Sequence, residues 1–275
     1  MIFASCRWQK PFGTIVFAEG IFWSGDLSTL RGKRVLVIVH GTANTDAQLR
    51  VLADEIASRN GGSFDAFVMF AWPGGATGIA YLYTKLTAVG RAAKFLARVL
   101  DEIGEAGAVT IDIDAHSLGV PIALESLLLT EEAVVEGLWL KAGACGRDLS
   151  KYRYEIHDWA TSVHVFYSRK DLIVAGLYRL WFGFGGALGA YGERTKGGNI
   201  GVQYDVSSEI GGSHVDYRRC NIVVQAIPGI GPRGKLWAVR LTVMALSILA
   251  TALALTAERI HDLVETASAL IGLDR

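Results

Sequence analysis

The stretch V-T-I-D-I-D-A-H-S-L-G-V-P-I-A-L-E-S-L-L, from Val109 to Leu128, decides the fold. Apolar and polar residues alternate over 109–114, the period of a β-strand, and residues 120–129 follow a helical pattern with Pro121 in the first turn. The turn between them, A-H-S-L-G, matches the elbow motif G-x-S-x-G, with Ala115 in place of the first glycine. Small residues are needed at both ends of this motif because strand and helix approach each other closely there. The stretch therefore predicts a sharp turn with Ser117 at its apex and its hydroxyl exposed above a sheet.

The rest of the chain alternates between strand and helix patterns. Arg34 to Val39 is a nearly continuous apolar run, which is typical of a strand buried on both faces. Further strands are predicted at 64–71, 138–142, 162–167 and 199–206, short opening strands at 14–17 and 21–23, and helices over about 45–60 and 79–103. This alternation predicts an α/β fold with a mostly parallel, doubly wound sheet.

Composition narrows the functional classes. The 275 residues carry 27 basic and 27 acidic side chains, so no positive excess points to a nucleic acid as partner. The three cysteines are far apart and form no CxxC pair, which argues against a disulfide framework or a zinc site. They indicate either a reducing compartment, and so a cytoplasmic location, or thiols without a function. The 51% hydrophobic content is high and indicates apolar segments beyond an ordinary core. We expect neither a metal nor an organic cofactor.

A catalytic serine needs a general base, and the base needs an acid that orients it. In α/β enzymes that carry the serine on such an elbow, the acid follows the serine in the chain and the histidine follows the acid. Asp171 follows the predicted strand at 162–167, and His214 lies on a glycine-bearing loop after the strand at 199–206. Taken singly, these are an ordinary loop carboxylate and a solvated histidine, but together they predict a triad of Ser117, Asp171 and His214. The competing residues have poorer positions; they are His40, His116, His157, His164 and His261 as bases, and Asp205 and Asp216 as acids.

The segment His40-Gly41-Thr42 follows the buried strand at 34–39 and is expected to pass beside the serine. We predict that the main-chain N–H groups of Thr42 and Leu118 form an oxyanion hole, with Ala43 replacing Thr42 if the turn is shifted by one residue. The alternative is that His-Gly is simply a tight turn.

Several motifs together resemble a family of bacterial α/β hydrolases of uncharacterised function. They are H-G-T-A-N-T at 40–45, F-A-W-P-G at 70–74, A-H-S-L-G at 115–119, S-R-K-D at 168–171 and S-H-V-D-Y at 213–217. That family carries His-Gly-Tyr-Asn, Ser-Trp-Pro-Ser and Ala-His-Ser-Met-Gly in the corresponding places. The resemblance implies an α/β-hydrolase fold and a serine-esterase-like triad. Ala115 agrees with it, because that family also has alanine two residues before the serine. The departures at Thr42, Ala43, Ala71, Gly74 and Leu118 leave the specificity open.

Two apolar stretches exceed what a hydrolase core requires. Leu172 to Tyr191 carries only Arg179 as a charge and is either a cover over the site or an ordinary packed helix. Leu241 to Ala257 is uncharged, and it either spans or lies on a membrane or packs on protein as a core helix or in a homodimer. We therefore expect a hydrolase domain over 1–230 and an apolar helical segment over 231–275.

The sequence predicts a serine hydrolase that cleaves small-molecule or lipid carboxylic esters through an acyl-enzyme. The alternatives are a membrane-associated lipase or phospholipase, and a catalytically inactive scaffold built on the same fold.

Overall fold

A single eight-stranded sheet organises the part of the chain that the computed structural model describes. The described residues are 1–9, 15–42, 45–60, 62–74, 79–131, 135–153, 156, 160–178, 185–195, 198 and 200–218. The strands lie in the order β2-β1-β4-β3-β5-β6-β7-β8, and only β1 and β2 pair antiparallel. Their bounds are β1 Ile2–Gln9, β2 Ile15–Trp23, β3 Arg34–Val39, β4 Ala66–Ala71, β5 Thr110–His116, β6 Val135–Lys141, β7 Ala160–Tyr167 and β8 Val202–Asp205.

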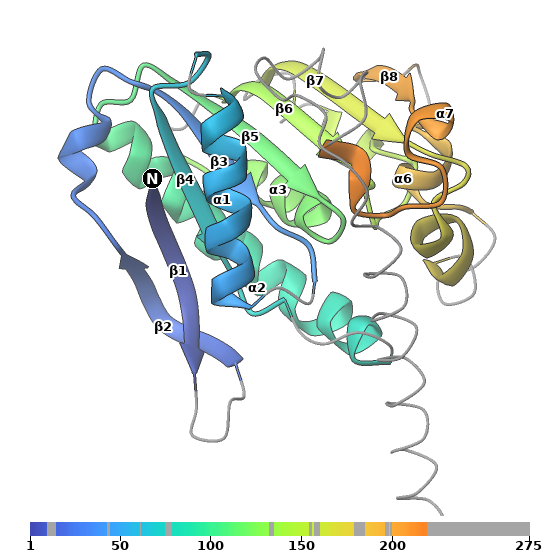
Figure 1. Ribbon diagram of the computed structural model, residues 1–275, viewed down its shortest axis with the longest axis horizontal. Helices are drawn as coiled ribbons and strands as arrows, with labels where there is room; N and C mark the ends of the chain where they lie inside the picture. Colours follow the sequence, from blue (N-terminus) through green and yellow to red (C-terminus); the bar gives the residue numbers. More distant parts are fainter. Residues whose placement is uncertain are drawn as a thin grey trace, which may run out of the picture.

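Helices cover both faces of this sheet, as Figure 1 shows. Helix α1 (Asp46–Asn60) lies on one face, and α2 (Ile79–Glu105) and α3 (Gly119–Leu127) lie on the other. Shorter helices are α6 (Leu188–Tyr191), α7 (Ser207–Ile210), a π-helix at Leu172–Leu177 and 3-10 turns at Leu27–Leu30, Ser150–Tyr152 and Asp216–Arg218. A parallel sheet buried on both faces needs apolar side chains on both, which explains the unbroken apolar run of β3.

The core is divided by the sheet into two layers. In β3, Val35, Val37 and Val39 pack among the residues of α2 and α3, whereas Leu36 and Ile38 pack with those of α1. All five side chains are buried. Alternate residues of a strand point to opposite faces, so one short segment anchors both layers of the fold.

The topology brings the predicted site residues to one edge. Strands β3 to β8 run parallel, so their carboxyl ends lie at the same edge of the sheet. The loop at 40–42 follows β3, Ser117 follows β5 and Asp171 follows β7. His214 comes after β8 and α7. Open α/β sheets bind ligands outside this edge, so the fold itself sets the location of the candidate site.

The N-terminal strands differ from the sequence prediction. Residues 2–9, which were not predicted as a strand, form β1, and it pairs in parallel with β4. The two opening strands expected at 14–17 and 21–23 are one continuous strand, β2. The intervening A-E-G lies within β2, although the register with β1 shifts there: Ser5 pairs with Phe22, and Arg7 pairs with Phe17. For β1, pairing with β4, a partner distant in the chain, overrides local propensity.

The described residues end at 218, before most of the C-terminal segment. The last described element is a 3-10 turn at Asp216–Arg218. The domain boundary at 230/231 and the apolar stretch Leu241 to Ala257 lie outside the described residues. Among the described helices, none combines the length and the apolar character needed to cross a membrane.

Candidate active site

Ser117 occupies the apex of a strained turn between β5 and α3. Its φ is +56°, one of two positive values among the described non-glycine residues. The turn is held by main-chain hydrogen bonds: the Ser117 N–H donates to the Lys141 carbonyl at 2.9 Å, and the Ser117 carbonyl accepts from Val120 and Ala144, each at 3.1 Å. A left-handed conformation costs a non-glycine residue about 1–3 kcal/mol and persists where the surroundings enforce it, commonly at functional sites. The sharp turn predicted from A-H-S-L-G is thus formed, but Ser117 is buried and not exposed as predicted.

Two glycines allow the close approach that this turn requires. A Cβ on Gly119 would overlap the Val39 carbonyl oxygen and lie 2.8 Å from that of His40. A Cβ on Gly41 would lie 2.8 Å from the Cβ of Ser117. The start of α3 therefore packs directly on the end of β3, and the loop after β3 packs directly on Ser117.

His214 joins Ser117 to Asp171 in one hydrogen-bonded chain. The distance from His214 Nε2 to Ser117 Oγ is 2.8 Å, and the distance from His214 Nδ1 to Asp171 Oδ2 is 2.7 Å. With the Nδ1 proton donated to the carboxylate, Nε2 is free to accept the serine proton. Ser117 and Asp171 are buried, and the His214 side chain is 13% exposed. The structure thus brings together the three residues that the sequence predicted as a triad.

The Asp171 carboxylate is fixed by four hydrogen bonds. Its Oδ1 accepts from the main-chain N–H groups of Ile173 at 3.0 Å and Val174 at 3.3 Å, at the start of the π-helix. Its Oδ2 accepts from the Tyr217 hydroxyl at 3.1 Å in addition to His214. Asp171 is therefore held as an acceptor facing the imidazole.

His116, a poorly placed base by sequence, holds the loop that carries His214. Its Nε2 lies 2.8 Å from the main-chain carbonyl oxygen of His214, and the two rings lie 5.0 Å apart between centroids. Because a carbonyl only accepts, the His116 Nε2 carries the hydrogen. The residue before the serine thus connects the elbow directly to the base.

The two predicted oxyanion donors have different surroundings. Leu118 directly follows Ser117 at the start of α3, and within the described part of the chain its N–H donates no hydrogen bond. Thr42 follows Gly41, and its Cα would lie 3.3 Å from a Cβ on Gly74. The alternative donor, Ala43, lies outside the described residues. The oxyanion role of Leu118 and Thr42 stays a prediction.

A family model matches residues 22–175, described as "Alpha/beta hydrolase of unknown function (DUF900)", and this is more than half of the chain. The chain belongs to this α/β hydrolase family. The matched range contains Ser117 and Asp171 but ends before His214. The order and direction of the strands agree with the fold that the sequence predicted.

Solved structures and curated proteins add little to this assignment. An uncharacterised protein from Bacillus cereus ATCC 10987, solved at 2.75 Å, is 13% identical with a TM-score of 0.40, over 52% of this chain and 44% of that protein. The product of the ydeN gene from B. subtilis is 19% identical with a TM-score of 0.31, over 50% of this chain and 73% of that protein. The chain thus spans less than half the length of the B. cereus protein. No curated protein matches this hydrolase-family chain.

The other histidines of this α/β hydrolase do not compete for the role of base. His40 is buried, and burial together with the Arg7 guanidinium holds the pKa of its imidazole well below the usual range. His164 lies within β7, where its ring stacks between those of Trp139 and Tyr204, and burial lowers its pKa. His157 and His261 lie outside the described residues.

Sequence reasoning missed the role of Tyr217. Its side chain is fully buried, and its hydroxyl lies within hydrogen-bond distance of Asp171 and of the Gly189 carbonyl oxygen, 3.0 Å away. Tyr217 was part of the motif S-H-V-D-Y, so the signal was present. The motif itself does not indicate which of its residues points inward, because Tyr217 lies in the 3-10 turn at Asp216–Arg218.

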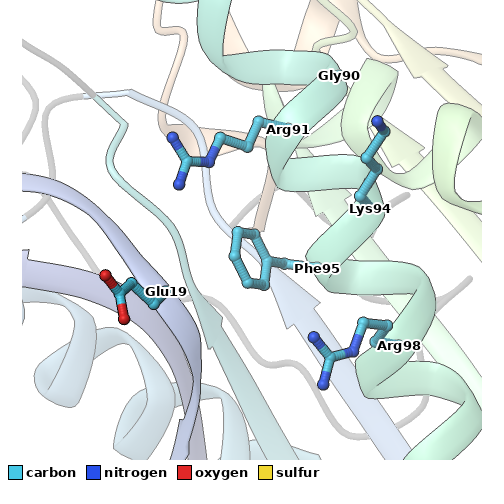
Figure 2. Close-up of a pocket in the computed structure, with 6 residues that line it drawn as sticks. All are labelled: Glu19, Gly90, Arg91, Lys94, Phe95 and Arg98. Carbon is cyan, nitrogen blue, oxygen red and sulfur yellow. The ribbon is translucent and has the colours of Figure 1, made fainter.

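A groove on the surface lies away from this cluster. It has a volume of about 610 Å³ and lies between Glu19 of β2 and the exposed face of α2 (Figure 2). Arg91, Phe95 and Arg98 extend from α2 toward Glu19. No member of the Ser117–His214–Asp171 cluster lines it, so we do not assign it to the substrate.

Proposed function

We propose that the protein is a serine hydrolase that cleaves carboxylic esters through an acyl-enzyme. The observation that carries the proposal is the hydrogen-bonded chain from Ser117 Oγ through His214 to Asp171, built on a turn with positive φ at the serine. A serine hydroxyl is a weak nucleophile at neutral pH, and a histidine oriented by a carboxylate is the standard means of activating it.

In this mechanism Ser117 Oγ attacks the ester carbonyl carbon as its proton passes to His214 Nε2. The Asp171 carboxylate stabilises the imidazolium that forms. The carbonyl oxygen becomes an oxyanion that accepts hydrogen bonds from the N–H groups of Leu118 and Thr42. The imidazolium then gives its proton to the departing alkoxide. A water molecule, deprotonated by His214, releases the acid by the same steps.

Active-site labelling tests this proposal most directly. We expect a fluorophosphonate probe to modify Ser117 in the folded protein, read by mass spectrometry of the digested chain. Ser117→Ala should abolish both labelling and the turnover of p-nitrophenyl acetate and butyrate. Ser126→Ala is the matched control, because Ser126 is also buried but donates to the Ala123 carbonyl within α3 at 2.8 Å. Labelling at another residue, or turnover that survives Ser117→Ala, would overturn the proposal.

Replacement of the other two residues tests their separate roles. His214→Ala should reduce kcat by about 10⁴-fold to 10⁶-fold, since the nucleophile and its base act as a unit. Asp171→Asn should reduce kcat by about 10⁴-fold, because an amide that donates toward Nδ1 favours the wrong tautomer of the imidazole. A wild type that neither labels nor turns over any ester would instead favour an inactive scaffold on the hydrolase fold.

One observation favours a lipid ester as the substrate. Leu172, directly after Asp171, is 61% exposed, and its side chain lies beside the loop at Gly212 that leads to His214. An exposed apolar side chain at the rim of the site can contact an acyl chain or a lipid surface. We expect activity to rise with acyl length from acetate to octanoate and on addition of phosphatidylcholine vesicles, and to rise less in Leu172→Ser. Equal gains in wild type and variant would remove the support that Leu172 gives.

A further inference from the structure

Arg7 is a buried cation at the point where β1 reaches the candidate site. Only 8% of the residue is exposed. The register between β1 and β2 shifts between Ser5 and Arg7, which marks a bulge. Buried and partly exposed residues alternate over Ile2–Ser5, but Cys6 and Arg7 are buried in succession. Ile2, Ala4 and Cys6 pack in the core layer of α2 and α3, so the ordinary alternation of the strand places Arg7 on the other face, where it meets Asp46 of α1.

The guanidinium of Arg7 connects three segments that meet at the edge of the sheet. Its Nε donates to the Trp72 carbonyl after β4 at 2.7 Å, and its Nη1 donates to Asp46 Oδ1 at the start of α1 at 2.7 Å. Its Nη2 lies 3.1 Å from His40 Nε2 in the loop after β3. These contacts use the planar, diverging donors of an arginine, which a lysine cannot reproduce.

The contact with Arg7 requires a neutral His40. Because Nε2 also accepts a hydrogen bond from the Trp72 N–H at 3.2 Å, it carries no proton. The proton is on Nδ1, which donates to the Gly41 carbonyl at 2.6 Å. Burial first, and the Arg7 charge second, depress the pKa of His40 and so favour this form. The ring is further held by stacking on the Trp72 indole, with centroids 5.4 Å apart.

The His40 ring in turn fixes the main chain that touches Ser117. Its Nδ1 holds the Gly41 carbonyl, and its own carbonyl accepts a hydrogen bond from the Trp72 indole at 2.9 Å. Gly41 lies against the Cβ of Ser117, and Gly74 lies against the Gly41 carbonyl and the Thr42 Cα. A shift of the ring would therefore move Gly41 and Thr42 relative to the serine.

We propose that Arg7 is a positioning residue: it fixes the neutral His40 ring and, through that ring, the Gly41–Thr42 main chain that serves as the second oxyanion donor. This inference rests on the serine hydrolase function proposed above and adds a residue outside the range matched by the family model. Arg7 does not touch the substrate. Its effect is on the placement of an amide that matters most in the transition state.

The experiment compares Arg7→Met and Arg7→Lys with the wild type in ester turnover and in the rate of fluorophosphonate labelling at Ser117. Arg7→Met should lower kcat by about 10-fold to 100-fold with KM within about threefold, since an interaction realised in the transition state is lost. Arg7→Lys keeps the charge but not the fork of donors, so its loss should be intermediate. Arg34→Met is the matched control, because Arg34 is exposed at the opposite end of β3, over the Phe64 ring. It should retain the wild-type kcat.

The pH profile separates positioning from a general loss of packing. Among the described residues, the charged group next to His40 is Arg7 on β1, which is itself paired with Asp46 at the start of α1. The Trp72 indole, which follows β4, stacks on the His40 ring, and His116 of β5 lies on the other side of Gly41. Without the Arg7 cation the pKa of His40 rises, and a protonated Nε2 can no longer accept from the Trp72 N–H. The acid-side decline of kcat in Arg7→Met should therefore begin at higher pH than in wild type and in Arg34→Met.

The outcomes distinguish this inference from the proposed function. If wild type labels at Ser117 and hydrolyses esters while a folded Arg7→Met keeps the wild-type kcat and pH profile, the inference is overturned and the function stands. If wild type does neither, the function is overturned and the inference with it. Should circular dichroism show that Arg7→Met is unfolded, Arg7→Lys carries the test by kcat and by the rate of labelling at Ser117, and wild-type values of both would overturn the inference.

Discussion

Replacing Gly119 by alanine is expected to disturb the candidate site through the addition of a single methyl group. The added Cβ would overlap the Val39 carbonyl oxygen and come within 2.8 Å of that of His40. Both neighbours are main-chain atoms of the central strand and the loop that follows it, so neither can rotate away. Either the start of α3 must move outward, or the end of β3 must shift.

The magnitude follows from two opposing terms. Alanine is favoured over glycine in a helix by about 1 kcal/mol, and by less at the first residue of one. Overpacking against a rigid neighbour costs about 1–3 kcal/mol, and more where backbone is involved. We expect Gly119→Ala to lower the free energy of unfolding by about 1–3 kcal/mol. We also expect fluorophosphonate labelling of Ser117 to slow by at least about tenfold, because the serine and the Leu118 amide move with the helix.

Gly90→Ala provides the matched control, and the assay is urea unfolding followed by far-ultraviolet circular dichroism. Gly90 lies within α2, and no atom is found within 4 Å of the position that its Cβ would take. This variant should gain about 0.5–1 kcal/mol and label at the wild-type rate. A Gly119→Ala variant that matches Gly90→Ala in both stability and labelling would refute the close approach of α3 to β3 as the reason for a glycine there.

Three further perturbations test other contacts of the site and the sheet. Tyr217→Phe removes the hydroxyl that lies within hydrogen-bond distance of Asp171 and the Gly189 carbonyl. It should lower the free energy of unfolding in urea by about 1–2 kcal/mol and reduce the kcat of ester turnover several-fold. Unchanged values would show that the hydroxyl does not order the carboxylate. Ser117→Gly should be more stable than Ser117→Ala by about 1 kcal/mol, because glycine adopts a positive φ without strain, and equal stabilities in the same unfolding assay would argue against strain at the turn. Burial raises the pKa of Asp112 to about 6, above its value in the unfolded chain, so its contribution to stability is present at pH 4 and is lost as the pH rises through 6. The free energy of unfolding of Asp112→Asn, relative to that of the wild type, should therefore rise by roughly 1–3 kcal/mol between pH 4 and pH 7.5. A difference that stays constant with pH would contradict the shift.

The residues of the candidate site were predictable because each follows a strand that can be recognised from its own stretch of sequence. Ser117 lies where a period of two changes to a helical period, and Asp171 and His214 come after apolar strands in the order that the fold requires. A parallel sheet then brings these loops to one edge whatever the details of the loops are. Hydrogen bonding between the three side chains, however, depends on rotamers and turns that no periodicity reveals.

The contributions of Arg7, His116 and Tyr217 could not be predicted for the same reason. Arg7 belongs to a strand whose parallel partner, β4, is distant in the chain, and its hydrogen-bond partners lie in three separate segments. His116 was recognised inside the elbow, but its acceptor is a main-chain carbonyl, which leaves no sequence signature. The inward orientation of Tyr217 comes from a single 3-10 turn.

The position of β1 between β2 and β4 also constrains the order in which the chain can fold. The N-terminal ribbon can join the sheet only after β4 has been synthesised and has aligned beside β3. Until then the ribbon is a two-stranded hairpin, which has little stability of its own in water, and it exposes Ile2, Ala4 and Cys6, which are buried in the folded protein. The pairing of β1 with β4 thus depends on contacts between distant parts of the chain, which form slowly. Recovery of enzymatic turnover during refolding should consequently lag behind the recovery of helical signal.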